Sequence, residues 1–152
     1  MIDEVDEKIL SILLEDASIP KSEIARRVGL AASAITERIK RLEAAGIIEG
    51  YEVRLDAAQL GRPLLAYIYV TDAKPKQDFN IVAAMSKVTG LEELHKLAGD
   101  DCYMLKVRTE GTAQLNEILD NEINHIPTVV RVRTTIVLKT VLETARLAKK
   151  AR

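Results

Sequence analysis

Between residues 32 and 45, polar and apolar side chains fall on opposite sides of a helix-length segment. At about 100° per residue, Ile35, Ile39 and Leu42 point to one side. The other side carries Ser33, Thr36, Glu37, Lys40 and Arg41. Hydroxyl, carboxylate and cationic groups read base edges and hold phosphates in nucleic acids. In that role Glu37 would accept a hydrogen bond from a cytosine amino group, and Lys40 would donate one to guanine.

Basic residues gather around the same segment, although the whole chain is almost neutral. The 152 residues include 22 Lys and Arg against 23 Asp and Glu, whereas residues 21–41 hold six basic and two acidic side chains. A compact basic stretch favours a local patch for a polyanion, and a solvated helix face is the alternative. Arg26, Arg27 and Arg41 suit phosphate contacts best. The full set of candidate DNA-binding residues is Arg26, Arg27, Ser33, Thr36, Glu37, Arg38, Lys40 and Arg41.

Three short helices are expected to position these side chains. Apolar residues recur at helical spacing over Val5–Leu13, and Pro20 suits the first turn of a second helix that Gly29 ends. The third helix runs from Ala32 to Ala45 and stops at Gly46. Its start is separated from the second helix by a short turn, as in a helix-turn-helix, whose second helix enters the DNA major groove.

After Gly46 the pattern changes, and Ile47–Leu55 has an extended pattern. The further expected elements are a strand at Leu64–Thr71, a helix at Asp78–Val88, strands at Leu91–Ala98 and Cys102–Thr109, a helix that Thr112 caps and Pro127 ends, and a strand at Val129–Leu138. The first of these helices would turn Phe79, Val82 and Met85 or Ser86 inward, and the second Leu115, Ile118, Leu119 and Ile123. This order predicts a ferredoxin-like βαββαβ domain.

Several strings of residues resemble a known family. The first third contains Ile2-Asp3-x-x-Asp6-x-x-Ile9-Leu10, Ser22-Glu23-Ile24-Ala25-Arg26-Arg27-Val28-Gly29-Leu30 and Ile35-x-x-Arg38-Ile39-x-x-Leu42-Glu43-x-x-Gly46-Ile47-Ile48-x-Gly50-Tyr51. The remainder contains Gly99-Asp100, Ile126-Pro127 and Thr134-x-Ile136-Val137-Leu138. Together these strings resemble the Lrp/AsnC (leucine-responsive/asparagine regulator) family of prokaryotic transcription regulators over nearly the whole chain.

The resemblance implies an α+β fold with two domains. An N-terminal helix-turn-helix (winged-helix-like) domain at 1–50 would be joined by a β-linker at 51–63 to a C-terminal ferredoxin-like βαββαβ regulatory domain at 64–140, with a tail at 141–152. Family members form homodimers through the regulatory domain and often assemble into octamers. Many bind an amino acid or a related small-molecule effector between regulatory domains. By position, the effector-binding residues would be Gly99, Asp100, Asp101, Cys102 and Thr134.

The sequence departs from the family pattern at four places. Pro20 stands where a Ser or Thr usually opens the second helix, and Ala31 stands at the cap of the third, where Ser33 is the nearest substitute. A missing cap typically costs about 1 kcal/mol. The second carboxylate of the family's turn falls at Cys102, while Ala98 replaces a Ser or Thr before the turn glycine. Asp101 lies one place earlier, and such a shift in a strand turns a side chain to the opposite face.

Other classes of protein find less support in the sequence. His95 and His125 lack metal-ligand spacing, and no phosphate-binding, dinucleotide-binding or nucleophile-elbow motif occurs. We therefore expect no enzyme, no catalytic residue, no metal and no cofactor. An RNA-binding sheet would stack bases on aromatic side chains. Tyr67, Tyr69 and Tyr103 lie on expected strands, but the motif around them is absent, which favours sheet packing or dimer contacts.

The compartment follows from what the sequence lacks. The longest apolar run, Leu64–Val70, is much shorter than the roughly 20 residues of a membrane helix, and the acidic N-terminus lacks a signal pattern. A single cysteine excludes an internal disulfide, so we expect a cytoplasmic protein with no membrane partner.

Together these observations predict a sequence-selective DNA-binding regulator. Its assembly or DNA affinity would respond to a small effector, with an amino acid expected, and its partners would be double-stranded DNA and further copies of itself. Two alternatives stay open. One is a ligand-sensing or assembly module without direct DNA regulation, and the other is an architectural DNA-binding protein with weak sequence preference.

Overall fold

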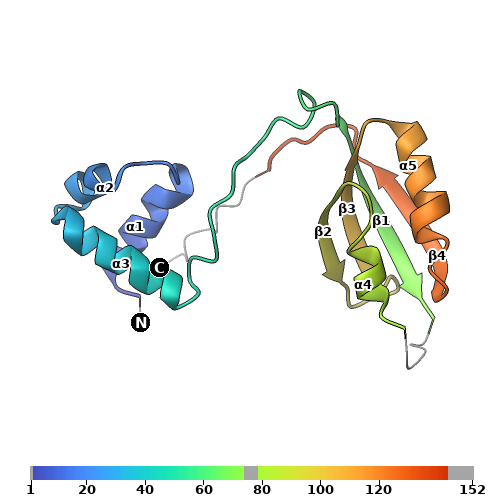
Figure 1. The fold of residues 1–152 in the computed structure, drawn as a ribbon, viewed down its shortest axis with the longest axis horizontal. Coiled ribbons are helices and arrows are strands. Elements are labelled where there is room, and N and C mark those ends of the chain that lie inside the picture. Colours follow the sequence, from blue (N-terminus) through green and yellow to red (C-terminus); the bar gives the residue numbers. More distant parts are fainter. Residues whose placement is uncertain (1, 74–78, 144–152) are drawn as a thin grey trace. The chain divides into compact units, whose positions relative to one another are not determined.

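The computed structural model describes residues 2–73 and 79–143, and the chain divides into two compact units (Figure 1). The first unit comprises Met1–Arg54 together with Leu142–Arg152, and the second comprises Leu55–Val141. Glu143 lies beside the end of the first stretch, since Arg54 Nη2 is 3.8 Å from Glu143 Oε2. The expected tail at 141–152 has no helix or strand over 141–143, and its remaining residues lie outside the described ones.

The first unit is built from three helices, α1 (Glu4–Glu15), α2 (Lys21–Val28) and α3 (Ala32–Ala44). Their apolar sides meet in a core that includes Ile9, Ile24, Ile35 and Ile39, all at most 2 % exposed. The inward face predicted for α3 is therefore confirmed. Gly29 ends α2 with φ +78°, a left-handed conformation that glycine adopts without steric cost, and the chain then turns into α3.

The three helices begin in different ways. At α1, the Asp3 side chain accepts from the backbone N–H of Asp6 and the Asp6 side chain accepts from that of Asp3, which forms a capping box. The α2 and α3 helices follow Pro20 and Ala31, and neither cap residue makes a side-chain hydrogen bond. As the sequence predicts, α2 and α3 therefore lack side-chain caps at their first turns.

The segment between α3 and the sheet differs from the prediction. Residues 45–63 contain turns but no strand, although Ile47–Leu55 has an extended pattern and 51–63 was expected to be a β-linker. A strand needs a second backbone to satisfy its N–H and C=O groups. Among the described residues of this chain, no strand pairs with this segment. The alternating apolar side chains of the segment stay exposed, with Val53 at 82 % and Leu55 at 69 %.

The second unit is an antiparallel sheet with strand order β2-β3-β1-β4, formed by β1 (Leu64–Asp72), β2 (Leu91–Lys96), β3 (Tyr103–Thr109) and β4 (Val129–Ile136). Figure 1 shows α4 (Ile81–Met85) and α5 (Thr112–Ile118) on one face of this sheet. A short π-helical segment, η1 (Leu119–Ile123), continues α5. The chain order and strand order confirm the ferredoxin-like prediction.

The core of this unit lies between the helices and one face of the sheet. Ile68 and Leu105 are opposite each other on β1 and β3, and both are fully buried with Met85 of α4 and Ile118 of α5. Because side chains alternate along a strand, Tyr67 and Tyr69 of β1 point to the other, open face of the sheet. Tyr103 instead belongs to the core cluster.

Two details of the helices correct the prediction. Phe79 and Met85 pack on the core as expected, whereas Val82 is 44 % exposed and Ile81 is buried in its place. The α4 helix is also shorter than Asp78–Val88, and Asp78 lies outside the described residues. Thr112 is the first residue of α5 and does not cap it, because the cap position is Gly111.

Candidate nucleic-acid interface and ligand-binding turn

The outward face of α3 is open to solvent in its middle. The side chains of Glu37 and Lys40 are 77 % and 67 % exposed, and Lys40 Nζ lies 3.9 Å from Glu37 Oε1. Ser33 is also exposed, one turn closer to the start of the helix. A surface ion pair of this kind stabilises a protein by less than about 1 kcal/mol. Lys40 can therefore exchange its carboxylate partner for a phosphate or a base at little cost.

Thr36 contributes less to this face than expected. Its hydroxyl donates to the backbone oxygen of Ala32 at 3.0 Å, and the residue is partly buried. This bond to the preceding turn is common for threonine in helices and occupies the only hydroxyl proton. The oxygen of Thr36 remains available only as an acceptor.

Arg38 and Arg41 are held by two acidic residues at the start of the first helix, the cap residue Asp3 and Asp6. Arg38 Nη1 lies 2.6 Å from Asp3 Oδ2 and 2.8 Å from Asp6 Oδ1, and Arg41 Nη2 lies 2.7 Å from Asp6 Oδ2. Burial works against ionisation of Asp6, but the hydrogen bonds from Arg38 and from the Asp3 backbone N–H give it a lowered pKa overall. Arg38 therefore makes its ion pairs inside the domain and is only 26 % exposed. Its expected contact with DNA stays a prediction.

Arg26 and Arg27 share one carboxylate at the start of the helix that precedes the turn. Arg26 Nη2 is 2.7 Å and Arg27 Nε 2.9 Å from Glu23 Oε1. Hydrogen bonds from Arg26 and then Arg27 lower the pKa of Glu23 to about 2. Both arginine side chains are at least 46 % exposed, so they can still reach a phosphate. The carboxylate nevertheless reduces the positive charge that the sequence suggests for this stretch.

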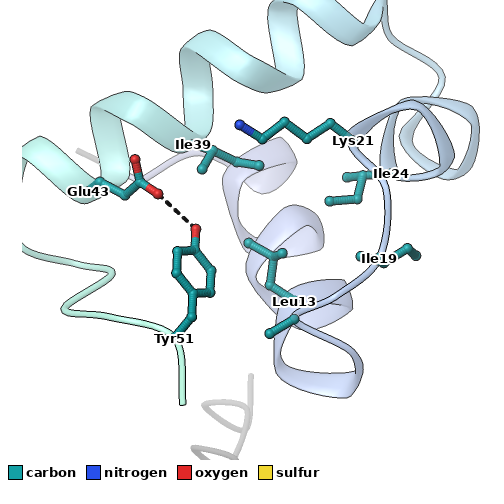
Figure 2. Close-up of a pocket in the computed structure, with 8 residues that line it drawn as sticks. Leu13, Ile19, Lys21, Ile24, Ile39, Glu43 and Tyr51 are labelled. Carbon is teal, nitrogen blue, oxygen red and sulfur yellow. Dashed lines mark hydrogen bonds between the residues drawn. The ribbon is translucent and has the colours of Figure 1, made fainter. Parts of the chain in front are cut away.

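A small hollow lies on another side of the three-helix unit (Figure 2). It measures about 180 Å³ and is lined by Leu13, Ala17, Ile19, Lys21, Ile24, Ile39, Glu43 and Tyr51. Tyr51 Oη donates to Glu43 Oε1 at 2.9 Å. Partial burial and then this carboxylate raise the pKa of Tyr51. The contact ties the segment after α3 back to α3, and nothing in the sequence pattern indicated it.

In the second unit, the turn at residues 99–102 contacts β4 through a residue that the sequence analysis missed. Arg133 Nη2 lies 2.7 Å from Asp101 Oδ2, and its guanidinium stacks over the ring of Tyr69 at 3.9 Å. The hydroxyl of Thr71 is 3.5 Å from Asp101 Oδ1. These side chains lie on the open face of the sheet. The hydrogen bond from Arg133 is the main cause of a lowered pKa of Asp101, so its carboxylate is already paired.

Thr134, expected beside the same turn, points the other way. Arg133 is opposite Tyr69 on β1, and Thr134 is opposite Ile68, whose side chain is buried under the helices. Adjacent residues of a strand face opposite sides of the sheet. Within one chain the structure therefore does not bring Thr134 together with Asp101. A site between two copies that uses both residues stays a prediction.

The other turn residues differ in exposure. Gly99, with φ +150°, and Asp100 are exposed. Cys102 is partly buried against the core, and its Sγ accepts from the backbone N–H of Asp72 at 3.5 Å. The thiol thus fills space in the position where the family has a carboxylate, and Asp100 is the exposed carboxylate of this turn.

A charged network covers another part of the open face. Lys106 is only 7 % exposed and lies 3.0 Å from Glu93 Oε1, while Arg108 Nε lies 2.7 Å from Glu92 Oε1. His95 Nε2 lies 3.0 Å from Glu93 Oε2. Within residues 2–73 and 79–143, no cluster of three or more His, Cys, Asp or Glu side chains is arranged to hold a metal ion. Nor is any helix in those residues long and apolar enough to cross a membrane.

A helix-turn-helix unit followed by a ferredoxin-like unit defines the class of two-domain transcription regulators that combine a DNA-binding and a sensing part. Comparisons with known proteins agree. Residues 2–49 match the family described as winged helix-turn-helix DNA-binding, and residues 66–147 match the Lrp/AsnC ligand binding domain. The chain belongs to the Lrp/AsnC family, and it is a helix-turn-helix transcription regulator.

Known regulators are similar to this chain over nearly its whole length. The HTH-type transcriptional regulator FL11 of Pyrococcus horikoshii is 37 % identical over 146 residues, which cover 96 % of this chain and 95 % of that protein. The leucine-responsive regulatory protein of Salmonella typhimurium is 33 % identical and covers 99 % of this chain and 93 % of its own.

Solved structures show the same fold. A transcriptional regulator of Neisseria meningitidis, in complex with L-Met, matches with a TM-score of 0.92 and 26 % identity over 97 % of both chains. The feast or famine regulatory protein of M. tuberculosis, complexed with L-methionine, has a TM-score of 0.89 and 30 % identity over 97 % of this chain and 99 % of that one.

Proposed function

We propose that this regulator contacts duplex DNA through the outward face of α3, with Ser33, Glu37 and Lys40 toward the bases. Arg26, Arg27 and Arg41 then contact the flanking phosphates, and Thr36 lies at the side of the face. The observation that carries this proposal is the exposure of Lys40 and Glu37 on the helix after the turn, where only a weak 3.9 Å pair has to open. Recognition helices of helix-turn-helix domains read base edges from this position.

The second part of the proposal is an amino-acid effector bound at the turn 99–102 of the regulatory domain. The exposed carboxylate of Asp100 suits the ammonium group of such a ligand. Support also comes from the two similar regulators whose structures were solved in complex with L-methionine. Asp101 is paired with Arg133, so a ligand that uses Asp101 has to compete with that ion pair.

We further propose that the protein works in the cytoplasm as a homodimer, with octamers as a higher assembly, and not as an enzyme. The open sheet face with Tyr67 and Tyr69 offers a surface for a second copy. Two copies of α3 about one helical turn of DNA apart would read a two-fold symmetric site. Genome-wide mapping of bound DNA would identify the operators and the target genes.

Replacing Lys40 with Ala tests the DNA interface. The variant loses a positively charged contact in the groove, so its affinity for DNA should fall. The slope of log affinity against log salt should flatten by up to about 0.9, the value for one neutralised phosphate, because the ammonium group also lies near the backbone. Gel-shift titrations over a range of salt measure both quantities. Lys8→Ala, which removes an exposed lysine from α1, is the matched control and should bind as the unaltered protein does.

Two results would contradict the proposal in different ways. Unchanged DNA affinity of Lys40→Ala would remove α3 from the interface and favour a sensing or assembly module. Loss of affinity that is equal on every DNA sequence would instead favour an architectural DNA-binding protein.

A further inference from the structure

Asp6 lies where the first helix meets the helix proposed to read DNA, and it does more than cap α1. Its side chain is 1 % exposed. One carboxylate oxygen accepts from Arg38 Nη1 at 2.8 Å, and the other accepts from Arg41 Nη2 at 2.7 Å and from the Asp3 backbone N–H at 3.2 Å. A single buried carboxylate thus holds two arginines from consecutive turns of α3.

The two arginines differ in exposure and in their further contacts. Arg38 is 26 % exposed and has a second bond to Asp3 Oδ2 at 2.6 Å, so it braces α3 against the start of α1. Arg41 is 59 % exposed and borders the outward face next to Lys40. A guanidinium has five N–H donors. Arg41 can therefore touch a phosphate while it keeps its bond to Asp6, but with part of its charge offset.

We propose that Asp6 is a positioning residue that determines the sequence specificity of DNA binding. It fixes the orientation of α3 through Arg38, and it limits the attraction of Arg41 to any phosphate. Phosphate contacts give affinity without sequence information, whereas base contacts discriminate. Asp6 would weaken the phosphate contact of Arg41 and keep α3 oriented for its base contacts. Both effects raise the ratio of specific to non-specific binding. This inference rests on the DNA interface proposed above.

The test compares two duplexes bound by the full-length protein. One is a duplex selected from a random pool by the unaltered protein, and the other is a scrambled version with the same composition. Asp6→Asn keeps the shape of the side chain and removes its charge. Glu7→Gln is the matched control, because it removes an equal charge from the adjacent, exposed position of α1.

Asp6→Asn should bind the scrambled duplex more tightly, because the charge of Arg41 is no longer partly offset. Its salt slope between about 50 and 200 mM salt should be steeper by a measurable amount of less than about 0.9, the value for one whole phosphate contact. It should bind the selected duplex more weakly, and the ratio of the two affinities should fall about tenfold, the size of one lost base contact. Adding Arg41→Ala to Asp6→Asn should abolish the gain on the scrambled duplex.

Several outcomes would overturn the inference. If Asp6→Asn loses the same affinity for both duplexes and its salt slope does not change, Asp6 has only a structural role. If Asp6→Asn binds both duplexes as Glu7→Gln does, Asp6 has no role in specificity. If Asp6→Asn fails to fold, single substitutions decide. Arg41→Ala should then flatten the salt slope by clearly less than Lys40→Ala, and an equal effect would overturn the inference. No effect of Lys40→Ala on either duplex would instead reject the DNA interface itself.

Discussion

Four arginines near the recognition helix have the same charge but different environments. Arg26 and Arg27 share Glu23 at the surface, Arg41 is half-exposed beside Asp6, and Arg38 is mostly covered between Asp3 and Asp6. A charge sum over residues 21–41 therefore overstates the field that DNA meets. The carboxylates that reduce this field also stabilise the domain, since charge-assisted hydrogen bonds are stronger than neutral ones.

These carboxylates make the stability of the first unit depend on pH. Hydrogen bonds from Arg38 and from the Asp6 backbone N–H lower the pKa of Asp3 to about 2, and Asp6 is also lowered. A carboxyl with a lowered pKa stabilises the folded state above its unfolded value near 4, and this contribution is lost as the pH falls toward 2. The free energy of unfolding should thus decrease between about pH 4 and pH 2.

Urea unfolding followed by circular dichroism checks this dependence, with Asp3→Asn as the comparison. Asparagine still caps a helix but carries no charge for Arg38. The variant should be less stable than the unaltered protein near pH 6, and the difference should shrink as the pH approaches 2. A difference that stays constant over this range would show that the ion pair does not contribute.

At the scale of single elements, the pairing of strands decides which side chains meet. On β4, Arg133 shares the open face with Tyr69, while Thr134 lies toward the helices with Ile68. A shift of one residue exchanges these roles. The turn at 99–102 meets the open face, so Arg133 and not Thr134 becomes the partner of Asp101 within the chain.

The close contact between Gly90, which precedes β2, and the backbone of Arg108 on β3 can be tested by substitution. Gly90 precedes β2 with φ +73°, and a Cβ atom there would lie 2.2 Å from the backbone oxygen of Arg108. Gly61 has a similar φ of +77°, but a Cβ atom there would meet nothing within 4 Å. Left-handed strain alone costs roughly 1–2 kcal/mol, and a backbone clash adds to it.

Gly90→Ala should therefore destabilise the second unit by clearly more than Gly61→Ala, which should lose only about 1 kcal/mol. Urea denaturation of both variants measures the difference. Equal losses would mean that the chain before β2 can move away from Arg108 without cost.

At the scale of the whole molecule, the proposed DNA-binding face and the proposed effector site lie in different units. The outward face of α3 belongs to the first unit and the turn at 99–102 to the second. A substitution in one should leave the basal activity of the other intact, because distant sites without shared partners are nearly additive. Coupling between them then has to come from a change in assembly or conformation that the effector favours.

Asp100→Asn tests this division of labour. It should weaken the binding of an amino acid, measured by calorimetry with a panel of amino acids, because the ammonium group loses a charged acceptor. Basal DNA affinity without effector should stay within experimental error of the unaltered protein, and Lys40→Ala should show the reverse pattern. A panel that gives no binding to the unaltered protein at millimolar concentration would reject the effector proposal.

The amino-acid sequence determined the local elements and their order. The spacing of Ile35, Ile39 and Leu42 defines the inward face of α3, and the run of strands and helices after residue 64 defines the ferredoxin-like unit. These features depend on the periodicity of neighbouring residues and on family motifs, which can be read along the chain.

Only the tertiary structure decided which charges are free and which side chains share a face. Asp6 and Arg38 are 32 residues apart in sequence, and Asp101 and Arg133 are also 32 residues apart. No local pattern links such residues, because their contact depends on how whole helices pack and on the register between strands. For the same reason, the extended pattern at 47–55 did not become a strand, since no second backbone among the described residues pairs with it.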